Sequence, residues 1–202
     1  MLNYIFEIVG TIAFAFSGLK VASNSRYDIF GGFVLAFCVA VGGGTVRDCM
    51  LGVSPFWTTS PVYVVCTLIA MVLFYLLRYR FKAIPSKLNQ FVFILSDTIG
   101  LALFTIAGAQ KACSFGMPIW VSIGMGCMTG VLGGIIRDVF AGIKPTIFSE
   151  DFYATASVIG ATVYFALLHV ALPVGVASVS GMATIVVLRI LAVHYKWHLP
   201  ML

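Results

Sequence analysis

The stretch Gly42-Gly43-Gly44-Thr45-Val46-Arg47-Asp48 places three consecutive glycines just before an arginine–aspartate pair, inside a long apolar segment. A similar stretch, Gly133-Gly134-Ile135-Ile136-Arg137-Asp138, lies ninety residues further along the chain. Glycine destabilises a helix interior by roughly 1 kcal/mol relative to alanine, and a charge inside a membrane core is also costly. Two such combinations at one fixed offset therefore indicate a duplicated feature with a structural or functional purpose.

The ninety-residue offset extends well beyond these two stretches. Without gaps, it aligns glycines, aromatic residues, a proline and an acidic position of the first half with equivalent residues of the second half. The aligned pairs include Gly10 with Gly100, Phe14 with Phe104, Gly18 with Gly108, Pro55 with Pro145, Tyr63 with Tyr153 and Glu7 with Asp97. So many matches at one offset exclude chance, and the sequence predicts an internal repeat.

The composition of the 202-residue chain is that of a polytopic membrane protein. Hydrophobic residues make up 61% of it, charged residues only 9%, and its mean hydropathy is +1.07. A soluble domain carries roughly 25% charged residues, so a soluble enzyme, a disordered protein and a secreted disulfide scaffold are excluded. The net charge of +5 comes from cations at the ends of apolar runs, which indicates membrane topology and lipid contact rather than nucleic-acid binding.

Seven continuous apolar stretches are predicted to be membrane helices, because the strands of a closed barrel would alternate in polarity. They cover roughly residues 4–22, 29–53, 61–79, 91–110, 118–143, 152–172 and 174–195. Each repeat holds three helices, an odd number, so the second copy must enter the membrane from the opposite side. The predicted fold is an all-α integral membrane protein with a single transmembrane domain at 1–202, built from inverted repeats at about 3–85 and 91–172 and a seventh helix at about 174–195.

The distribution of Lys and Arg predicts the orientation. Ten of these residues fall on the side of the C-terminus and two on the side of the N-terminus. Without Arg47 and Arg137, which approach the membrane region, the contrast is nine against one. Cytoplasmic loops carry the excess of positive charge, so we expect the N-terminus outside and the C-terminus in the cytoplasm, in the cell (inner) membrane.

The glycine stretches are predicted to bend or unwind the second and fifth helices. Gly42 lies 13 residues beyond Ile29, or about 20 Å into the membrane, which is past its midplane. Carbonyl groups freed by an unwound turn would suit a permeating cation. Under the alternative interpretation, Gly43, Gly44, Gly133 and Gly134 only let two helices pack closely.

The duplicated Arg-Asp pairs are the second candidate feature. Neighbouring residues on a helix point about 100° apart, so we expect pairing between the repeats, Arg47 with Asp138 and Arg137 with Asp48. In that case the four side chains would form a ring at a pore mouth. The alternative is an interfacial cap in which each arginine extends to the lipid headgroups.

Three further groups of charged residues are candidates for a role. Lys20 and Lys111 lie near the ends of the first and fourth helices, where we expect them to extend to the lipid headgroups. The other two groups have two interpretations each. Glu7 and Asp97 would either complement the dipoles at the starts of the first and fourth helices or form a vestibule that attracts cations. The basic residues Arg78, Arg80 and Lys82 would either contact anionic lipid or only set the topology.

Catalysis and metal binding find no support in the sequence. The five cysteines are scattered, and none of the three histidines belongs to a motif for hydrolysis, phosphate binding or zinc binding. We therefore expect no enzymatic activity, no cofactor and no resident metal ion beyond transient potassium.

Two three-helix repeats, each with glycines that lead into Arg-Asp, followed by a seventh helix, resemble the prokaryotic trimeric intracellular cation (TRIC) channel family. The resemblance covers about residues 3–195 and is carried by Gly42–Asp48 and Gly133–Asp138. It implies a homotrimer in which each protomer has its own pore for potassium and other monovalent cations, narrowest at the second and fifth helices. Animal members carry Lys-Glu-Val after the first glycine bend, whereas this chain has Thr45-Val46-Arg47, so phosphoinositide control does not transfer.

The function predicted first is a potassium-permeable cation channel that is gated at the glycine stretches. Inverted repeats suit alternating access equally well, and bacterial relatives have been described as presumed glycine transporters. The alternative is therefore a secondary transporter of a small zwitterion such as glycine. A purely structural scaffold would leave the duplicated Arg-Asp pairs unexplained.

Overall fold

The computed structural model describes residues 2–80, 86–148, 152–195 and 197, and omits the side chains of 2–3 and 86–89. Within these ranges the chain is helical throughout and contains no strand. Its elements are α1 (Leu2–Asn24), α2 (Ile29–Met50), η1 (Phe56–Thr59), α3 (Val62–Arg80), α4 (Ser86–Ser114), α5 (Ile119–Phe140), η2 (Thr146–Phe148), α6 (Ala154–His169) and α7 (Val174–Tyr195), where η denotes a 3-10 helix.

The predicted class, an all-α membrane protein with seven helices, is confirmed. Six of the described helices are long and apolar enough to cross a membrane, and α6 is a shorter apolar helix of 16 residues. The observed helix bounds differ from the predicted ones mainly at the ends of α2 and α5 and at the start of α4. Helices α2 and α5 end three residues early, at Met50 and Phe140, and α4 begins already at Ser86.

The two repeats correspond closely in their local structure. Each bound of α5 is the bound of α2 plus ninety, and the 3-10 helices η1 and η2 begin at the same offset. The turns that end α2 and α5 also match, because Gly52 and Gly142 both have a positive φ, +71° and +67°. Glycine adopts this left-handed conformation without the steric cost of a side chain, which explains its presence just beyond both helix ends.

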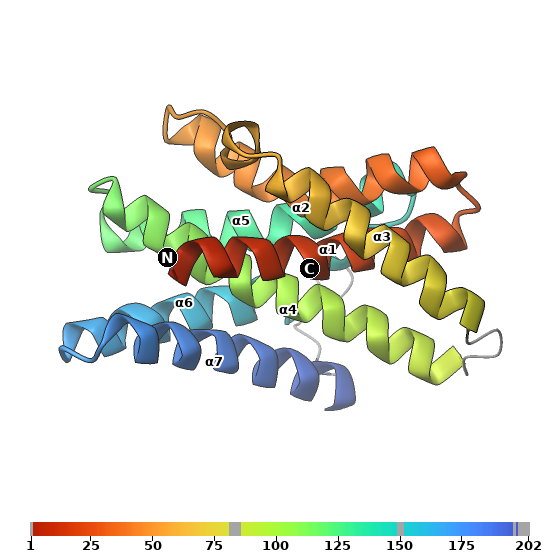
Figure 1. The fold of residues 1–202 in the computed structure, drawn as a ribbon. Helices are drawn as coiled ribbons and strands as arrows, with labels where there is room; N and C mark the ends of the chain where they lie inside the picture. The colour runs from red at the N-terminus through yellow and green to blue at the C-terminus, as the bar shows by residue number, and fades with distance from the viewer. Residues whose placement is uncertain (1, 81–85, 149–151, 196, 198–202) are drawn as a thin grey trace.

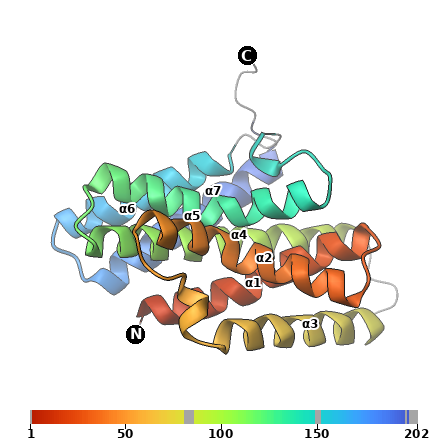
Figure 2. The same ribbon diagram turned by 90° about the horizontal axis from the view of Figure 1, so that it is seen from above.

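Four helices form the centre of the molecule (Figure 1). Helix α1 of the first repeat packs on α2 and α4, and α5 of the second repeat packs on the same two helices. Helix α3 lies along α1 at one flank, and α6 and α7 pack together at the other flank (Figure 2). The centre therefore combines the first two helices of each repeat.

The core between the repeats is centred on two phenylalanines at equivalent positions. The rings of Phe14 and Phe104 stack with centroids 5.4 Å apart and planes 8° apart. A Cβ at Gly100 would overlap the Phe14 ring, and one at Gly10 would lie 2.9 Å from the Phe104 ring. Each repeat thus supplies both a ring and the glycine that accommodates the ring of the other repeat.

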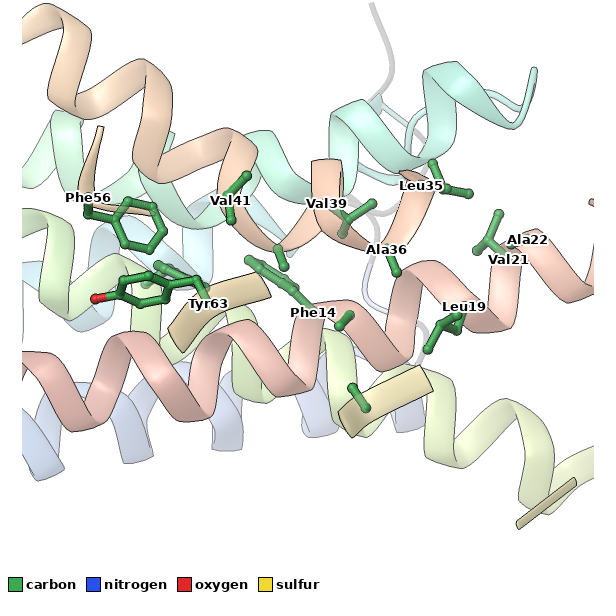
Figure 3. Packing of buried hydrophobic residues seen from close by; sticks show 14 residues of the cluster. Phe14, Leu19, Val21, Ala22, Leu35, Ala36, Val39, Val41, Phe56 and Tyr63 are labelled. Carbon is green, nitrogen blue, oxygen red and sulfur yellow. The ribbon is translucent and has the colours of Figure 1, made fainter. Parts of the chain in front are cut away.

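The buried cluster of the first repeat continues from Phe14 in both directions between α1 and α2 (Figure 3). Phe56 and Tyr63 lie together at one end of this cluster, with ring centroids 4.5 Å apart. Leu19 and Val21 lie at its other end (Figure 3). This packing holds the end of α2 against α1 and α3, where the charged residues of the first repeat gather.

Candidate functional site between the repeats

The glycine stretches do not interrupt their helices. Helix α2 is continuous from Ile29 to Met50, and α5 is continuous from Ile119 to Phe140. The predicted unwound turn at Gly42–Gly44 is therefore wrong for this structure, and so is its counterpart at Gly133 and Gly134. The helical hydrogen bonds of these backbone groups stay intact, and the glycines instead allow close packing between the helices.

Helices α2 and α5 cross where a glycine of one meets a backbone carbonyl of the other. A Cβ at Gly43 would overlap the carbonyl oxygen of Thr129, and a Cβ at Gly133 would lie 2.7 Å from that of Val39. Gly43 and Gly133 are equivalent positions, and so are Val39 and Thr129, so the crossing is symmetric. Any side chain at these glycines would push the two helices apart.

One contact at the crossing is asymmetric. Gly42 leaves room for the side chain of Ile136, whose Cδ1 would overlap a Cβ at that position. The position equivalent to Gly42 in the second repeat is Leu132. Gly42, the glycine that the second stretch lacks, therefore accommodates the side chain of Ile136 from α5.

The charged residues form two clusters. The first cluster consists of Glu7, Arg47, Asp48, Tyr63 and Lys111. Arg47 Nε lies 2.7 Å from Asp48 Oδ1, and its Nη2 lies 3.2 Å from Glu7 Oε1. Lys111 Nζ lies 2.8 Å from the same Asp48 oxygen, and the Tyr63 hydroxyl donates to Glu7 Oε2 at 3.0 Å. Helices α1, α2, α3 and α4 thus each contribute to this cluster.

The second cluster consists of Ser17, Asp97, Arg137, Asp138 and Thr146. Arg137 Nε lies 2.7 Å from Asp138 Oδ1, and Nη1 contacts Asp97 and donates to Ser17 Oγ at 2.6 Å. Its Nη2 donates to Thr146 Oγ1 at 3.2 Å. The Arg137 side chain is fully buried, and each of its three nitrogens has a partner.

Each arginine therefore pairs with the aspartate that follows it, and the predicted pairs Arg47–Asp138 and Arg137–Asp48 are wrong. The clusters lie at different levels of the bundle, since Glu7 and Ser17 are ten residues apart on α1, or roughly 15 Å. Each arginine bends so that Nε, close to its backbone, reaches the neighbouring carboxylate.

The two aspartates also fix the turns that follow their helices. Asp48 Oδ2 accepts the backbone N–H of Phe56 at 2.8 Å, and Asp138 Oδ2 accepts that of Thr146 at 2.7 Å. Both contacts span eight residues, from the helix end to the first residue of the following 3-10 helix. These bonds explain why Asp is needed next to Arg, and they argue against the expected interfacial cap with extended arginines.

The acidic residues Glu7 and Asp97 do not lie in the first turns of their helices, so the dipole interpretation is wrong. Both are partners of the arginines instead. The Asp97 side chain is 2% exposed, which does not fit an open vestibule, whereas Glu7 is 13% exposed. Only the first cluster brings a carboxylate to the surface.

Two basic residues have roles that the sequence did not indicate. Lys111, expected at a helix end facing headgroups, pairs with Asp48 and is 24% exposed. Arg189, one of the ten basic residues counted on the side of the C-terminus, is buried in α7, and its guanidinium lies 4.6 Å from the centroid of the Tyr153 ring. Lys111 has no basic counterpart at Val21, so the repeat alignment gave no signal for it.

The basic residues that were predicted to contact lipid or set the topology belong to neither cluster. Arg78 and Arg80 are exposed in the last turn of α3, and Lys82 lies outside the described residues. No group of three metal-binding side chains occurs in the part of the chain that the structure describes.

The fold and the two clusters define a class of protein: a polytopic membrane protein of two inverted three-helix repeats and a seventh helix. A family model described as "Glycine transporter" matches the chain twice, at residues 4–79 and 94–169. The chain is also 37% identical over 203 residues to the UPF0126 inner membrane protein YadS of Escherichia coli K12, covering 100% of this chain and 95% of that protein. A UPF0126 membrane protein of Vibrio cholerae is 36% identical over 201 residues, 99% of this chain and 82% of the relative.

The chain also superposes on solved structures of TRIC channels. A TRIC trimeric intracellular cation channel orthologue from Rhodobacter sphaeroides superposes with a TM-score of 0.87 at 33% identity, over 96% of this chain and 98% of that one. A prokaryotic TRIC channel crystallised in 0.5 M KCl gives a TM-score of 0.89 at 26% identity, over 98% of this chain and 99% of that one. The chain belongs to this family, the prokaryotic TRIC channels, as the sequence resemblance predicts.

Proposed function

We propose that the protein is a channel for monovalent cations, potassium among them, in a bacterial inner membrane. The observation that carries this proposal is the match to TRIC channel structures at TM-scores of 0.83 to 0.89 over nearly the whole chain. The protein would assemble as a homotrimer with one pore in each protomer. Its N-terminus would face outward, because cytoplasmic ends of membrane helices carry the excess of positive charge. The basic residues Lys20, Arg26, Arg78 and Arg80 lie near the C-terminal ends of α1 and α3, away from Glu7 near the start of α1.

The narrow part of the pore would lie between α2 and α5. Their close contact, where a Cβ at Gly43 or Gly133 would meet a backbone carbonyl of the other helix, supports a closed state. Opening would separate the two helices and withdraw Ile136 from Gly42. The clusters at Arg47–Asp48 and Arg137–Asp138 would hold the ends of these helices while their middles move.

A glycine transporter is the second candidate, because the matching family model carries that description. Both functions use the same inverted repeats, and the type of transport separates them. A channel passes ions rapidly down their gradient in unitary steps, whereas a transporter moves its solute slowly and saturably.

Paired flux measurements in proteoliposomes test the proposal. We expect fast potassium efflux down a gradient, unitary current steps in a planar bilayer, and no gradient-dependent uptake of labelled glycine. Replacing Gly43 with Leu should reduce potassium flux strongly, whereas Gly124→Leu, at a position with open space around it, should not. Saturable glycine uptake without current steps would overturn the channel assignment.

A further inference from the structure

The first cluster contains a buried hydrogen-bond donor that the chain does not satisfy. Arg47 Nη1 has no hydrogen-bond partner among the described residues, although the side chain is only 1% exposed. Leaving a buried donor of a charged group unpaired is costly, so such a group is rarely retained without a reason.

In the second cluster, the atom equivalent to Arg47 Nη1 has two partners. Arg137 Nη1 donates to Ser17 Oγ and contacts Asp97. The residue equivalent to Ser17 in the other repeat is Ala107, which has no hydroxyl group. The carboxylate equivalent to Asp97 is Glu7, and it binds Nη2 of Arg47 instead of Nη1. The orphaned donor therefore follows from two specific differences between the repeats.

A guanidinium N–H forms its strongest hydrogen bonds with an anionic acceptor. Lys111 Nζ lies in the same cluster, and the charges of Arg47 and Lys111 balance those of Glu7 and Asp48. The partly exposed side chains of Glu7 and Lys111 connect the cluster to the surface, whereas the second cluster is sealed. Arginine and lysine together recognise carboxylates through charge-assisted hydrogen bonds.

We propose that the first cluster is a binding site for a small carboxylate, whose oxygen accepts a hydrogen bond from Arg47 Nη1. Binding at this site does not depend on cation conduction, whereas its effect on conduction rests on the proposed function. A bound carboxylate would change the net charge of the cluster from zero to minus one. Cations would then be enriched at this end of the protein, so the solute would modulate conduction.

The test uses the purified full-length protein and its thermal unfolding at constant pH and ionic strength. Sodium acetate should raise the unfolding temperature saturably above the value in sodium chloride, because a ligand that binds only the folded state stabilises it. Glycine and glycinamide distinguish the source of the carboxylate. A larger effect of glycine than of acetate would identify an amino acid, with its ammonium group on Glu7, and glycinamide should have no effect.

The variant Ala107→Ser provides the matched test. Its hydroxyl should satisfy Arg47 Nη1 as Ser17 satisfies Arg137, and acetate affinity should fall about tenfold, the worth of one ordinary hydrogen bond. Ser17→Ala in the second cluster should leave acetate affinity unchanged. If acetate and chloride have equal effects on the native protein, or if a folded Ala107→Ser protein binds acetate as tightly as the native one, the proposal is wrong.

Discussion

The two charged clusters have the same plan but differ in their access to solvent. Each contains an arginine, the aspartate that follows it, and a carboxylate from the first helix of its repeat. In the second cluster, Ser17 and Thr146 complete the arginine's hydrogen bonds and the site is closed. In the first cluster, Lys111 and Glu7 take part and reach the surface. The two repeats thus share one arrangement of arginine and carboxylates. A few residue differences between them leave the first cluster partly exposed and the second cluster buried.

The largest expected effect is the loss of a carboxylate from the closed cluster. Asp97→Asn removes one of the two carboxylates that pair with the fully buried Arg137 and leaves Nη1 without its charged partner, so we expect a loss of about 3 to 5 kcal/mol in unfolding free energy. Glu7→Gln, in the partly exposed cluster, should cost about 1.5 to 3 kcal/mol. Denaturant unfolding in detergent micelles measures both values. Equal losses would mean that the difference in exposure has no energetic consequence.

The next largest effect concerns the crossing of α2 and α5. Gly43→Ala places a methyl group against the carbonyl oxygen of Thr129, and overpacking of this kind costs about 1 to 3 kcal/mol. Gly124→Ala is the matched control, because nothing lies within 4 Å of its Cβ position. That variant should be as stable as the native protein or slightly more stable. A Gly43→Ala protein with native stability would show that α2 and α5 separate easily.

The hydroxyl that distinguishes the clusters has a smaller effect. Ser17→Ala leaves Arg137 Nη1 with Asp97 alone, and we expect a loss of about 1 to 1.5 kcal/mol. Ala107→Ser should instead raise stability, since it supplies a partner to Arg47. Thermal unfolding in sodium chloride compares the two variants directly. Destabilisation by both would show that the clusters are not equivalent in geometry around these positions.

The smallest effect is expected at the basic end of α3. Arg78 and Arg80 are exposed there, and each cation near an anionic surface contributes about 1 kcal/mol of attraction. The double change to Gln should reduce the amount of anionic lipid that copurifies, as measured by mass spectrometry, and leave unfolding unchanged. Equal lipid content would restrict these arginines to setting the topology.

Much of the fold could be predicted because helices in membranes leave strong signals. Continuous apolar runs gave seven helices, and the pairs Gly10–Gly100 and Phe14–Phe104 gave the inverted repeat. The sites were harder to predict. Arg47 and Asp48 were identified, but side-chain angles on an ideal helix gave the wrong partners, because a long arginine can bend back on its neighbour. Lys111 was missed as a partner because it has no counterpart in the other repeat.

The glycines illustrate a second limit. Their number indicated an unusual helix, and the sequence supported both an unwound turn and a close crossing. Only the position of the partner helix decides between them, and that position depends on contacts such as Gly43 with Thr129, which are distant in sequence. The residue pattern of one helix does not show which backbone atoms of another helix will pack against it.

The exchange of rings between Phe14 and Phe104 has a consequence for biogenesis. When the first three helices leave the ribosome, Phe14 still lacks Gly100, and Gly10 still lacks the ring that it accommodates. The first repeat must therefore wait in the bilayer with an incomplete interior until α4 has been inserted. Synthesis of the second half completes the first, so the two halves mature as one unit despite their common origin.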